Sequence, residues 1–294
     1  MAETKYGHLV KKLKFVEGAG KTRGTGYPDY AVRVAGKDLE GLNLYFGWGF
    51  ASNVGEWSPG RSGGHVHPSS ECLVTVGLDY NNPNYLGAEL EIAMGEEYEK
   101  HVFDTPTVVA VPGGLMHCSL VTRRVDKPYG FLLIYLGGEY KVTDLPERSG
   151  PPPTGNKYGH LVKKLDMRDT KRKEGGNADF IAGWNGKDME GFELNFTWAF
   201  HTGLGAWHTR DPHTHPADEC LLFVGLDYDN PDYLGAEIEI AMGKEQEKHI
   251  FDTPTVVVVP KGLVHCPLIT RRVDKPYGFS AISLNTGHET TWLG

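Results

Sequence analysis

Two short segments of this chain carry side chains that bind transition metals. The segment HVHPSSE contains His65, His67 and Glu71, and the later segment PGGLMH ends in His117. In His-x-His the two imidazoles project from the same face of a strand, because side chains alternate along it. Imidazole nitrogens and a carboxylate oxygen form a mixed donor set suited to several transition metals. These spacings predict a metal site built from His65, His67, Glu71 and His117.

The second half of the chain repeats the same donors. HTHPADE contains His213, His215 and Glu219, and PKGLVH ends in His265. Most residues between the donors of the first motif differ from one copy to the other, whereas the donors do not. A single histidine would be an ordinary polar residue, so the repetition of the whole set is what favours metal binding. We therefore expect one divalent transition metal in each half, with Mn, Fe and Zn left open.

Both donor sets belong to a long internal repeat. YGHLVKKL begins at Tyr6 and recurs from Tyr158, and residues 77–135 align without gaps to 225–283 with 45 of 59 positions identical. Between the copies, ERSGPPPTGNK (147–157) has the composition of a linker. A chain of 294 residues suits two domains. The repeat predicts an N-terminal domain over 1–150 and a C-terminal domain over 151–294.

Strand patterns dominate both copies. In GLNLYFGWGF (41–50) large apolar residues alternate with polar or small ones, the period of a half-buried strand. TVVAVP (107–112) and TVVVVP (255–260) are continuous apolar runs rich in β-branched residues, typical of buried strands. The only candidate helix is the short, charged GEEYEKH (95–101). Together with 38 glycines and 18 prolines, these patterns predict an all-β protein.

The two motifs of each half resemble those of the cupin superfamily, His-x-His-x3-Glu followed by Pro-x-Gly-x2-His. The resemblance covers most of the chain and implies a bicupin, with two tandem jelly-roll barrels that each hold a metal. There are departures. An asparagine often found four residues after the last histidine is replaced by Val121 and Ile269. The arginine-rich approach to the first motif of oxalate decarboxylases is also absent, so the sequence does not assign the chain to that subfamily.

Residues just before the first motif are candidates for the substrate pocket. Trp57 and Trp207 are expected to border the cavity mouth, although core packing explains them equally well. His208 stands where the first copy has Ser58, and a histidine near a metal can act as a general acid or base. The alternative is a surface histidine. The approaches 60–64 and 208–212 also differ, so we expect the second copy to carry the more distinctive chemistry.

Each cysteine directly follows a predicted ligand: Cys72, Cys118, Cys220 and Cys266. If the ligands point into the barrel, strand alternation points these thiols out of it. No CxxC motif occurs, so we expect reduced thiols that contribute to packing rather than to metal binding.

Charge and hydropathy exclude two classes of partner. A net charge of −8 disfavours nucleic-acid binding, since an acidic surface repels phosphates. No apolar stretch is long enough to span a bilayer, which excludes a membrane helix. The N-terminal residues show no signal-peptide pattern, so we expect a cytoplasmic protein. A monomer and a homo-oligomer both stay open.

The resemblance implies an enzyme with a small-molecule substrate. The leading hypothesis is a dioxygenase or related oxidoreductase acting on an enolisable diketone or hydroxylated aromatic. The alternative is a redox-neutral isomerase, decarboxylase or C–C hydrolase, in which the metal polarises a carbonyl. A non-enzymatic binding or storage bicupin is the third hypothesis. It is disfavoured because storage bicupins tend to have lost metal ligands, whereas all eight donors are present here.

Overall fold

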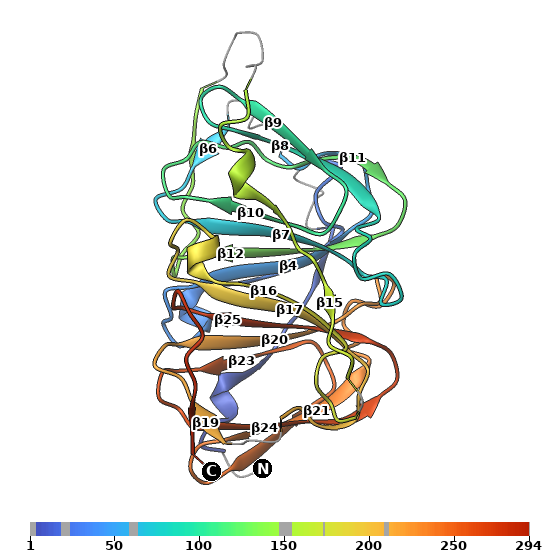
Figure 1. The fold of residues 1–294 in the computed structure, drawn as a ribbon, viewed down its shortest axis with the longest axis vertical. Helices are drawn as coiled ribbons and strands as arrows, with labels where there is room; N and C mark the ends of the chain where they lie inside the picture. The colour runs from blue at the N-terminus through green and yellow to red at the C-terminus, as the bar shows by residue number, and fades with distance from the viewer. Residues whose placement is uncertain are drawn as a thin grey trace. The chain divides into compact units, whose positions relative to one another are not determined.

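The computed structural model of this chain describes residues 4–18, 24–58, 64–146, 155–172, 174–208 and 212–293. These residues form β-strands and loops (Figure 1), which confirms the all-β prediction. The helical elements among them are short 3-10 turns: η1 (Gly7–Leu9), η2 (Gly36–Asp38), η3 (Gly159–Leu161) and η4 (Gly186–Asp188). The candidate helix at 95–101 is wrong, because residues 95–98 form a turn between two strands. None of the described helices is long and apolar enough to cross a membrane.

Two compact units make up the chain, and they interleave in sequence. The first unit is Phe15–Asp166, and the second unit combines Met1–Lys14 with Met167–Gly294. The boundary predicted from the sequence lay at residue 150 instead. The difference arises because each YGHLVKKL segment packs in the unit formed mainly by the other repeat.

The first unit contains a seven-stranded antiparallel sheet and smaller sheets. The large sheet runs in the order β14 (Val162–Lys164), β10 (Thr107–Val111), β7 (Glu71–Gly77), β12 (Tyr129–Tyr135), β4 (Tyr45–Ala51), β3 (Tyr30–Val34) and β2 (Val16–Glu17). A four-stranded sheet runs β5 (Gly55–Glu56), β11 (Val121–Val125), β8 (Ala88–Met94) and β9 (Glu99–Phe103). A two-stranded sheet joins β13 (Thr143–Asp144) to β6 (His65–Val66).

The second unit repeats this arrangement. Its large sheet runs β1 (Val10–Lys12), β23 (Thr255–Val259), β20 (Glu219–Gly225), β25 (Tyr277–Ser283), β17 (Asn195–His201), β16 (Phe180–Trp184) and β15 (Arg168–Asp169). Its other sheet runs β22 (Glu247–Phe251), β21 (Ala236–Met242), β24 (His265–Val273), β19 (His213–Thr214) and β26 (Thr291–Trp292), with β18 (Gly205–Ala206) also on β24.

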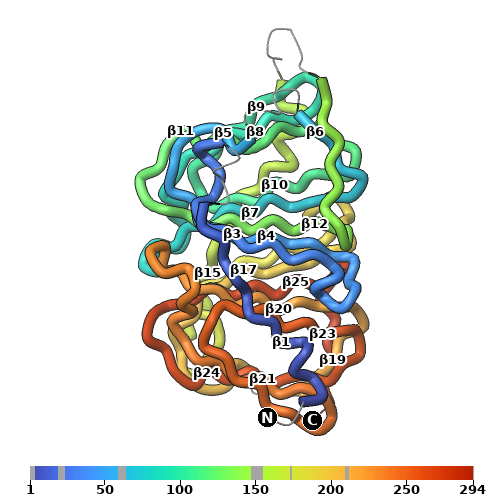
Figure 2. Tube along the Cα trace, turned by 180° about the vertical axis from the view of Figure 1, so that it is seen from behind, coloured from blue at the N-terminus to red at the C-terminus, as the bar shows by residue number. Residues whose placement is uncertain are grey.

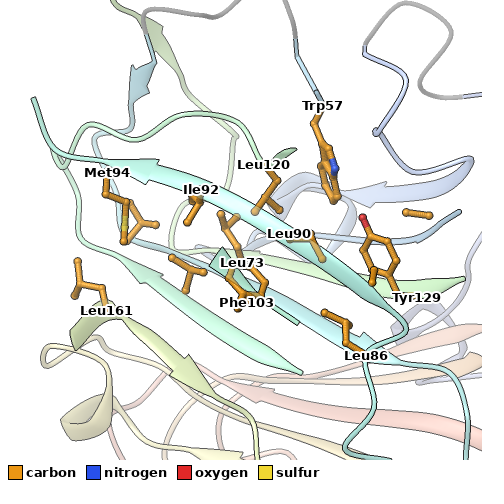
Figure 3. Packing of buried hydrophobic residues seen from close by; sticks show 14 residues of the cluster. Trp57, Leu73, Leu86, Leu90, Ile92, Met94, Phe103, Leu120, Tyr129 and Leu161 are labelled. Atoms are coloured by element: carbon orange, nitrogen blue, oxygen red, sulfur yellow. The ribbon is translucent and has the colours of Figure 1, made fainter. Parts of the chain in front are cut away.

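A hydrophobic core joins the two main sheets of the first unit. Leu73 and Val109 come from the seven-stranded sheet, whereas Leu90, Ile92 and Met94 come from β8 of the four-stranded sheet. All five side chains are nearly inaccessible to solvent, and Figure 3 shows the cluster that they help to form. Because the two sheets share one core, they face each other as the walls of a barrel. The predicted buried strands β10 and β23 are buried along their whole length.

One of the two edge strands of each large sheet comes from the other repeat. β1 pairs antiparallel with β23, where Val10 lies opposite Val257, and Figure 2 shows the two strands side by side within the second unit. In the first unit β14 pairs in the same way with β10, where Val162 lies opposite Val109. The two repeats have therefore exchanged their N-terminal strands.

Each exchanged segment docks on the turn that precedes β9 or β22. In the first unit, the Glu99 carboxylate accepts hydrogen bonds from the backbone N–H groups of Lys157 and Tyr158, at 2.8 and 2.9 Å. The Tyr158 ring lies against Gly95, which has φ +72° and no room for a Cβ. Glycine alone meets both requirements without strain. Gly243 and Tyr6 repeat the contact in the second unit, with φ +75°.

We expect Lys11→Pro to loosen β23 and Lys163→Pro to loosen β10. Proline fits poorly within a paired strand, and these residues lie opposite Val256 and Val108. Hydrogen–deuterium exchange should show faster exchange at 255–259 in the first variant and at 107–111 in the second. The two variants are matched controls for each other. If Lys11→Pro instead loosens 107–111, the strands are not exchanged and the boundary lies at residue 150.

Candidate metal centres

Four buried side chains converge in the first unit. His65, His67, Glu71 and His117 each place a ligand atom so that all four atoms lie within 4.8 Å of one another. Glu71 Oε1 lies 2.8 Å from His117 Nε2 and 3.5 Å from His67 Nε2. Such a compact group of nitrogen and oxygen donors has the composition of a transition-metal site. We refer to these residues as the first centre.

Three different segments position the first centre, where the sequence predicted two strands. His65 lies on the two-residue strand β6, Glu71 opens β7, and His117 lies in an isolated bridge outside the named strands. The backbones of His65 and His117 pair directly, since each N–H donates to the carbonyl of the other at 2.9 and 3.0 Å. This antiparallel pair brings together two donors that are far apart in sequence.

Backbone carbonyls orient two of the imidazoles. His67 Nδ1 lies 2.5 Å from the Lys141 carbonyl oxygen, and His117 Nδ1 lies 3.2 Å from that of Leu115. A carbonyl only accepts hydrogen bonds, so each Nδ1 carries the proton and Nε2 keeps its lone pair for a metal. Lys141 belongs to residues 136–144, which we call the strap of the first unit. The sequence offered no motif for this partner.

The second unit builds a matching centre. His213, His215 and His265 are buried and place ligand nitrogens within 4.8 Å of one another. Glu219 Oε2 lies 3.6 Å from His215 Nε2 and 3.7 Å from His265 Nε2. The predicted residues are therefore brought together in both units. Glu219 stands slightly further from its histidines than Glu71 does from His117.

The second centre has equivalent backbone partners. His215 Nδ1 lies 2.7 Å from the Glu289 carbonyl oxygen, and His265 Nδ1 lies 3.1 Å from that of Leu263. Glu289 lies on residues 284–292, the strap of the second unit. Both straps end in a short strand that pairs with the strand carrying the first histidine ligand. The repeat has therefore conserved the support of the site together with its donors.

The electrostatics of the second centre fit a divalent cation. Burial raises the pKa of Glu219 to about 8 and lowers the pKa of His213 to about 3 and of His265 to about 4. The imidazoles are therefore neutral at pH 7, the form that binds metals. A cation among these side chains would favour the ionised form of Glu219. Each unit thus holds one donor group suited to one divalent metal ion.

The straps place different side chains beside the two centres. In the first unit the Tyr140 hydroxyl lies 3.2 Å from His67 Nε2 and 3.5 Å from Glu71 Oε2. In the second unit His288 occupies the matched position, and its ring centre lies 4.7 Å from that of His215. Sequence reasoning missed both residues. The signal available was that Tyr140 and His288 stand at matched positions of the repeat and differ in type.

A cavity of about 120 Å³ opens beside the first centre. Three of the metal donors line it, His65, Glu71 and His117, as does the predicted pocket residue Trp57. Its apolar wall is formed by Leu73, Leu120, Phe131 and Leu133, and its polar lining is Tyr27, Arg33, Tyr45, Ser58, Cys118, Ser119 and Tyr140. The metal donors therefore face a space that a small molecule can enter.

Cys118 contributes to the lining of the cavity, and the outward orientation of its thiol stays a prediction. The charged groups that act on this thiol are Lys100, Glu56 and Glu91, none of which lines the cavity. Burial raises the pKa of Cys118 to about 11, so the thiol is protonated at pH 7. Neither metal-binding group of the described residues includes a cysteine.

Trp207 packs in a cluster of rings in the second unit. Its ring centre lies 4.1 Å from that of His201, in a stacked pair, and 4.8 Å from that of Phe279. Phe223 adds a further ring, 5.0 Å from Phe279. In the first unit, Ala51 and Thr75 stand where His201 and Phe223 stand here. The larger side chains fill space beside Trp207 that smaller side chains leave beside Trp57.

His208, the predicted general acid or base, is exposed, and its ring centre lies 6.4 Å from that of Trp292. The ring centre of Trp292 lies 4.8 Å from that of His213. Trp292 therefore lies between His208 and the second centre. A role in proton transfer stays a prediction. Most of the two approach segments, residues 59–63 and 209–211, lies outside the described residues.

Comparisons with known proteins identify the fold. No protein-family model matches the chain, and no curated protein matches its sequence. Oxalate decarboxylase from Bacillus subtilis, in a study of its Mn(II) centres, superposes with a TM-score of 0.61 at 13% identity, covering 97% of this chain and 79% of that chain. A structure of the same enzyme at pH 4.6 gives a TM-score of 0.61 at 12% identity, covering 97% and 78%. The likeness confirms the expected tandem jelly-roll barrels.

We expect His67→Ala to empty the first centre and leave the second occupied, and His215→Ala to do the reverse. Each unit supplies its own donors, so each variant should hold about one metal equivalent where the parent protein holds two. Elemental analysis after anaerobic reconstitution with Mn, Fe or Zn measures this. If one substitution empties both centres, the donors are not independent. If the parent protein holds none of the three metals, the metal assignment fails.

Proposed function

We propose that this chain, which has the bicupin fold, is a metal-dependent enzyme that acts on a small oxygenated molecule at its first centre. The observation that carries the proposal is the cavity of the first unit, which opens onto His65, Glu71 and His117. A fold neighbour with Mn(II) centres supports a divalent transition metal, whose identity stays open. The substrate class and the reaction type are inferred from the cavity wall.

The size of the cavity favours a small substrate. About 120 Å³ is well below the roughly 300–1,000 Å³ of pockets that take drug-sized ligands. The donors and Tyr140 make one part of its lining polar, whereas Leu73, Leu120 and Phe131 make another part apolar. Apolar walls exclude water, which strengthens the interactions of a charged or polarised group inside. A compact molecule with oxygen atoms on one side matches this lining.

The Tyr140 hydroxyl is positioned to move a proton. The hydroxyl lies within hydrogen-bond distance of His67 Nε2, the atom that would hold the metal. It can therefore also reach an oxygen atom of a substrate bound beside that metal. A bound metal would polarise such an oxygen as a Lewis acid. Donation from Tyr140 Oη would then stabilise the negative charge that develops on it. The phenol favours redox-neutral chemistry of the isomerase, decarboxylase or C–C hydrolase type.

Oxygen consumption separates this proposal from the dioxygenase predicted from sequence. The test incubates the metal-loaded protein with small keto acids, hydroxy acids and diketones, follows products by NMR spectroscopy, and records dissolved O2. Turnover of one of these compounds without O2 uptake supports redox-neutral chemistry. Turnover with stoichiometric O2 uptake supports the dioxygenase. Absence of turnover with a full complement of Mn, Fe or Zn argues against an enzyme of either kind.

The two centres are proposed to be unequal, with turnover at the first. The sequence favoured the second copy, because His208 stands near its first donor. The structure brings Tyr140 into contact with His67, whereas His208 is exposed and 6.4 Å, between ring centres, from Trp292. In the second unit His201 and Phe223 also fill space beside Trp207. We therefore propose the first centre as catalytic and leave the second as a metal site of another role.

We expect Tyr140→Phe to lower kcat by about 10²–10⁴-fold, the range for loss of a general acid or base. Phenylalanine keeps the ring that lies 5.2 Å from Tyr45 and removes only the hydroxyl. Metal content and unfolding temperature should stay at the parent values. Tyr85→Phe, which removes an exposed hydroxyl hydrogen-bonded to Asp126, is the control. Equal kcat in all three proteins would exclude a proton-transfer role for Tyr140.

We expect Glu71→Gln to reduce turnover far more than Glu219→Gln. Both substitutions exchange a carboxylate donor for a weaker amide donor, but only Glu71 lines the cavity described beside the first centre. Steady-state kinetics with metal content determined for each variant measures the difference. The reverse order would make the second centre catalytic and restore the role predicted for His208.

A further inference from the structure

Arg33 lines the cavity of the first centre from a strand that carries no metal donor. It lies on β3, opposite Gly47 of β4, and its side chain is exposed to solvent. The same cavity is lined by Glu71 and His117, so a molecule inside it can contact both Arg33 and the metal donors. Gly47 has no side chain to occupy the space beside Arg33 Cγ and Leu133 Cβ.

The charge of Arg33 is not neutralised by a described carboxylate. Its guanidinium donates a hydrogen bond to the Tyr27 hydroxyl and lies over the Tyr27 ring, with Cζ 5.5 Å from the ring centre. Burial lowers the pKa of Arg33, but the neighbouring phenols of Tyr27, Tyr45 and Tyr140 raise it by more, so the pKa lies above its usual value. Arginine stays charged at physiological pH, and its planar fork matches a carboxylate. A cation surrounded by phenols is an anion-binding group.

This group is present in the first copy alone. Gly183 of β16 stands where Arg33 stands on β3, since it lies opposite Thr197 of β17 as Arg33 lies opposite Gly47. Asn195 stands where the first copy has Tyr45, and its amide nitrogen donates to the carbonyls of Asn285 and Gly287, both at 2.9 Å. The second copy thus keeps the metal donors and has lost the cation.

We propose that Arg33 determines substrate specificity by binding the carboxylate of a small organic acid, whose other oxygen atoms face the first centre. The inference rests on the proposed function and names its substrate class. A compact acid fits a cavity of about 120 Å³ with a cation and metal donors in its lining. The apolar side chains of the lining, among them Leu73 and Phe131, would contact its carbon skeleton. A neutral substrate would leave the guanidinium without an anionic partner.

The test compares a diacid with its neutral amide. Malonate and malonamide are titrated into the Mn(II)-loaded full chain by isothermal calorimetry, for the parent protein and for Arg33→Gln, Arg33→Lys and Arg168→Gln. Loss of a hydrogen bond to a charged group should weaken malonate binding by about 10–100-fold in Arg33→Gln. Arg33→Lys should retain part of the affinity, because it keeps the charge but not the fork. Malonamide should bind weakly and equally to all four proteins.

Arg168→Gln is the matched control, since it removes an exposed arginine from β15, at the edge of the second unit's large sheet. It should bind malonate as the parent protein does. Equal malonate affinity of the parent and Arg33→Gln would overturn the inference, as would failure of the parent protein to prefer malonate over malonamide. Failure of the proposed function is distinguishable, because Arg33-dependent malonate binding would then persist while no turnover depends on Tyr140.

Discussion

The backbone pair between His65 and His117 is the constraint on which the first unit depends. Its two hydrogen bonds, 2.9 and 3.0 Å long, join the start of one motif to the end of the other. His213 and His265 pair antiparallel in the second unit. Once this pair forms, two imidazoles stand side by side, and the glutamate that opens the next strand faces them. The strap then closes over the same short strand and supplies an acceptor for the remaining histidine.

Donor chemistry could be predicted from sequence because it is local. The spacing of His65, His67 and Glu71 limits where their side chains point, and the repeat confirms the set. Arg33 and Tyr140 come from segments without a motif, and only the three-dimensional arrangement brings them to the cavity. The repeat also showed which residues correspond, but not which strands pair.

The two units thus share the same sheets and metal donors but differ in the side chains around them. The donors, the backbone acceptors of their Nδ1 atoms and the register of the large sheets are repeated. The walls differ at a few positions, where alanine and threonine in one unit are replaced by histidine and phenylalanine in the other. Burial lowers the pKa of His201 to about 4, so this histidine packs as a neutral ring. Small substitutions in the wall therefore change the available space while the metal donors stay the same.

The exchange of N-terminal strands also affects the order in which the two units can complete their folding. On a growing chain, Val10 is made long before its partner Val257, whereas Val162 follows its partner Val109 much more closely. The edge of β10 is covered as soon as the second repeat begins to emerge. β1 must instead wait until β23 has been synthesised. Pairing across such a separation in sequence is slow, because a long loop must close first. Residues 10–12 are therefore made well before the strand that they pair with, and they can reach their place only after it.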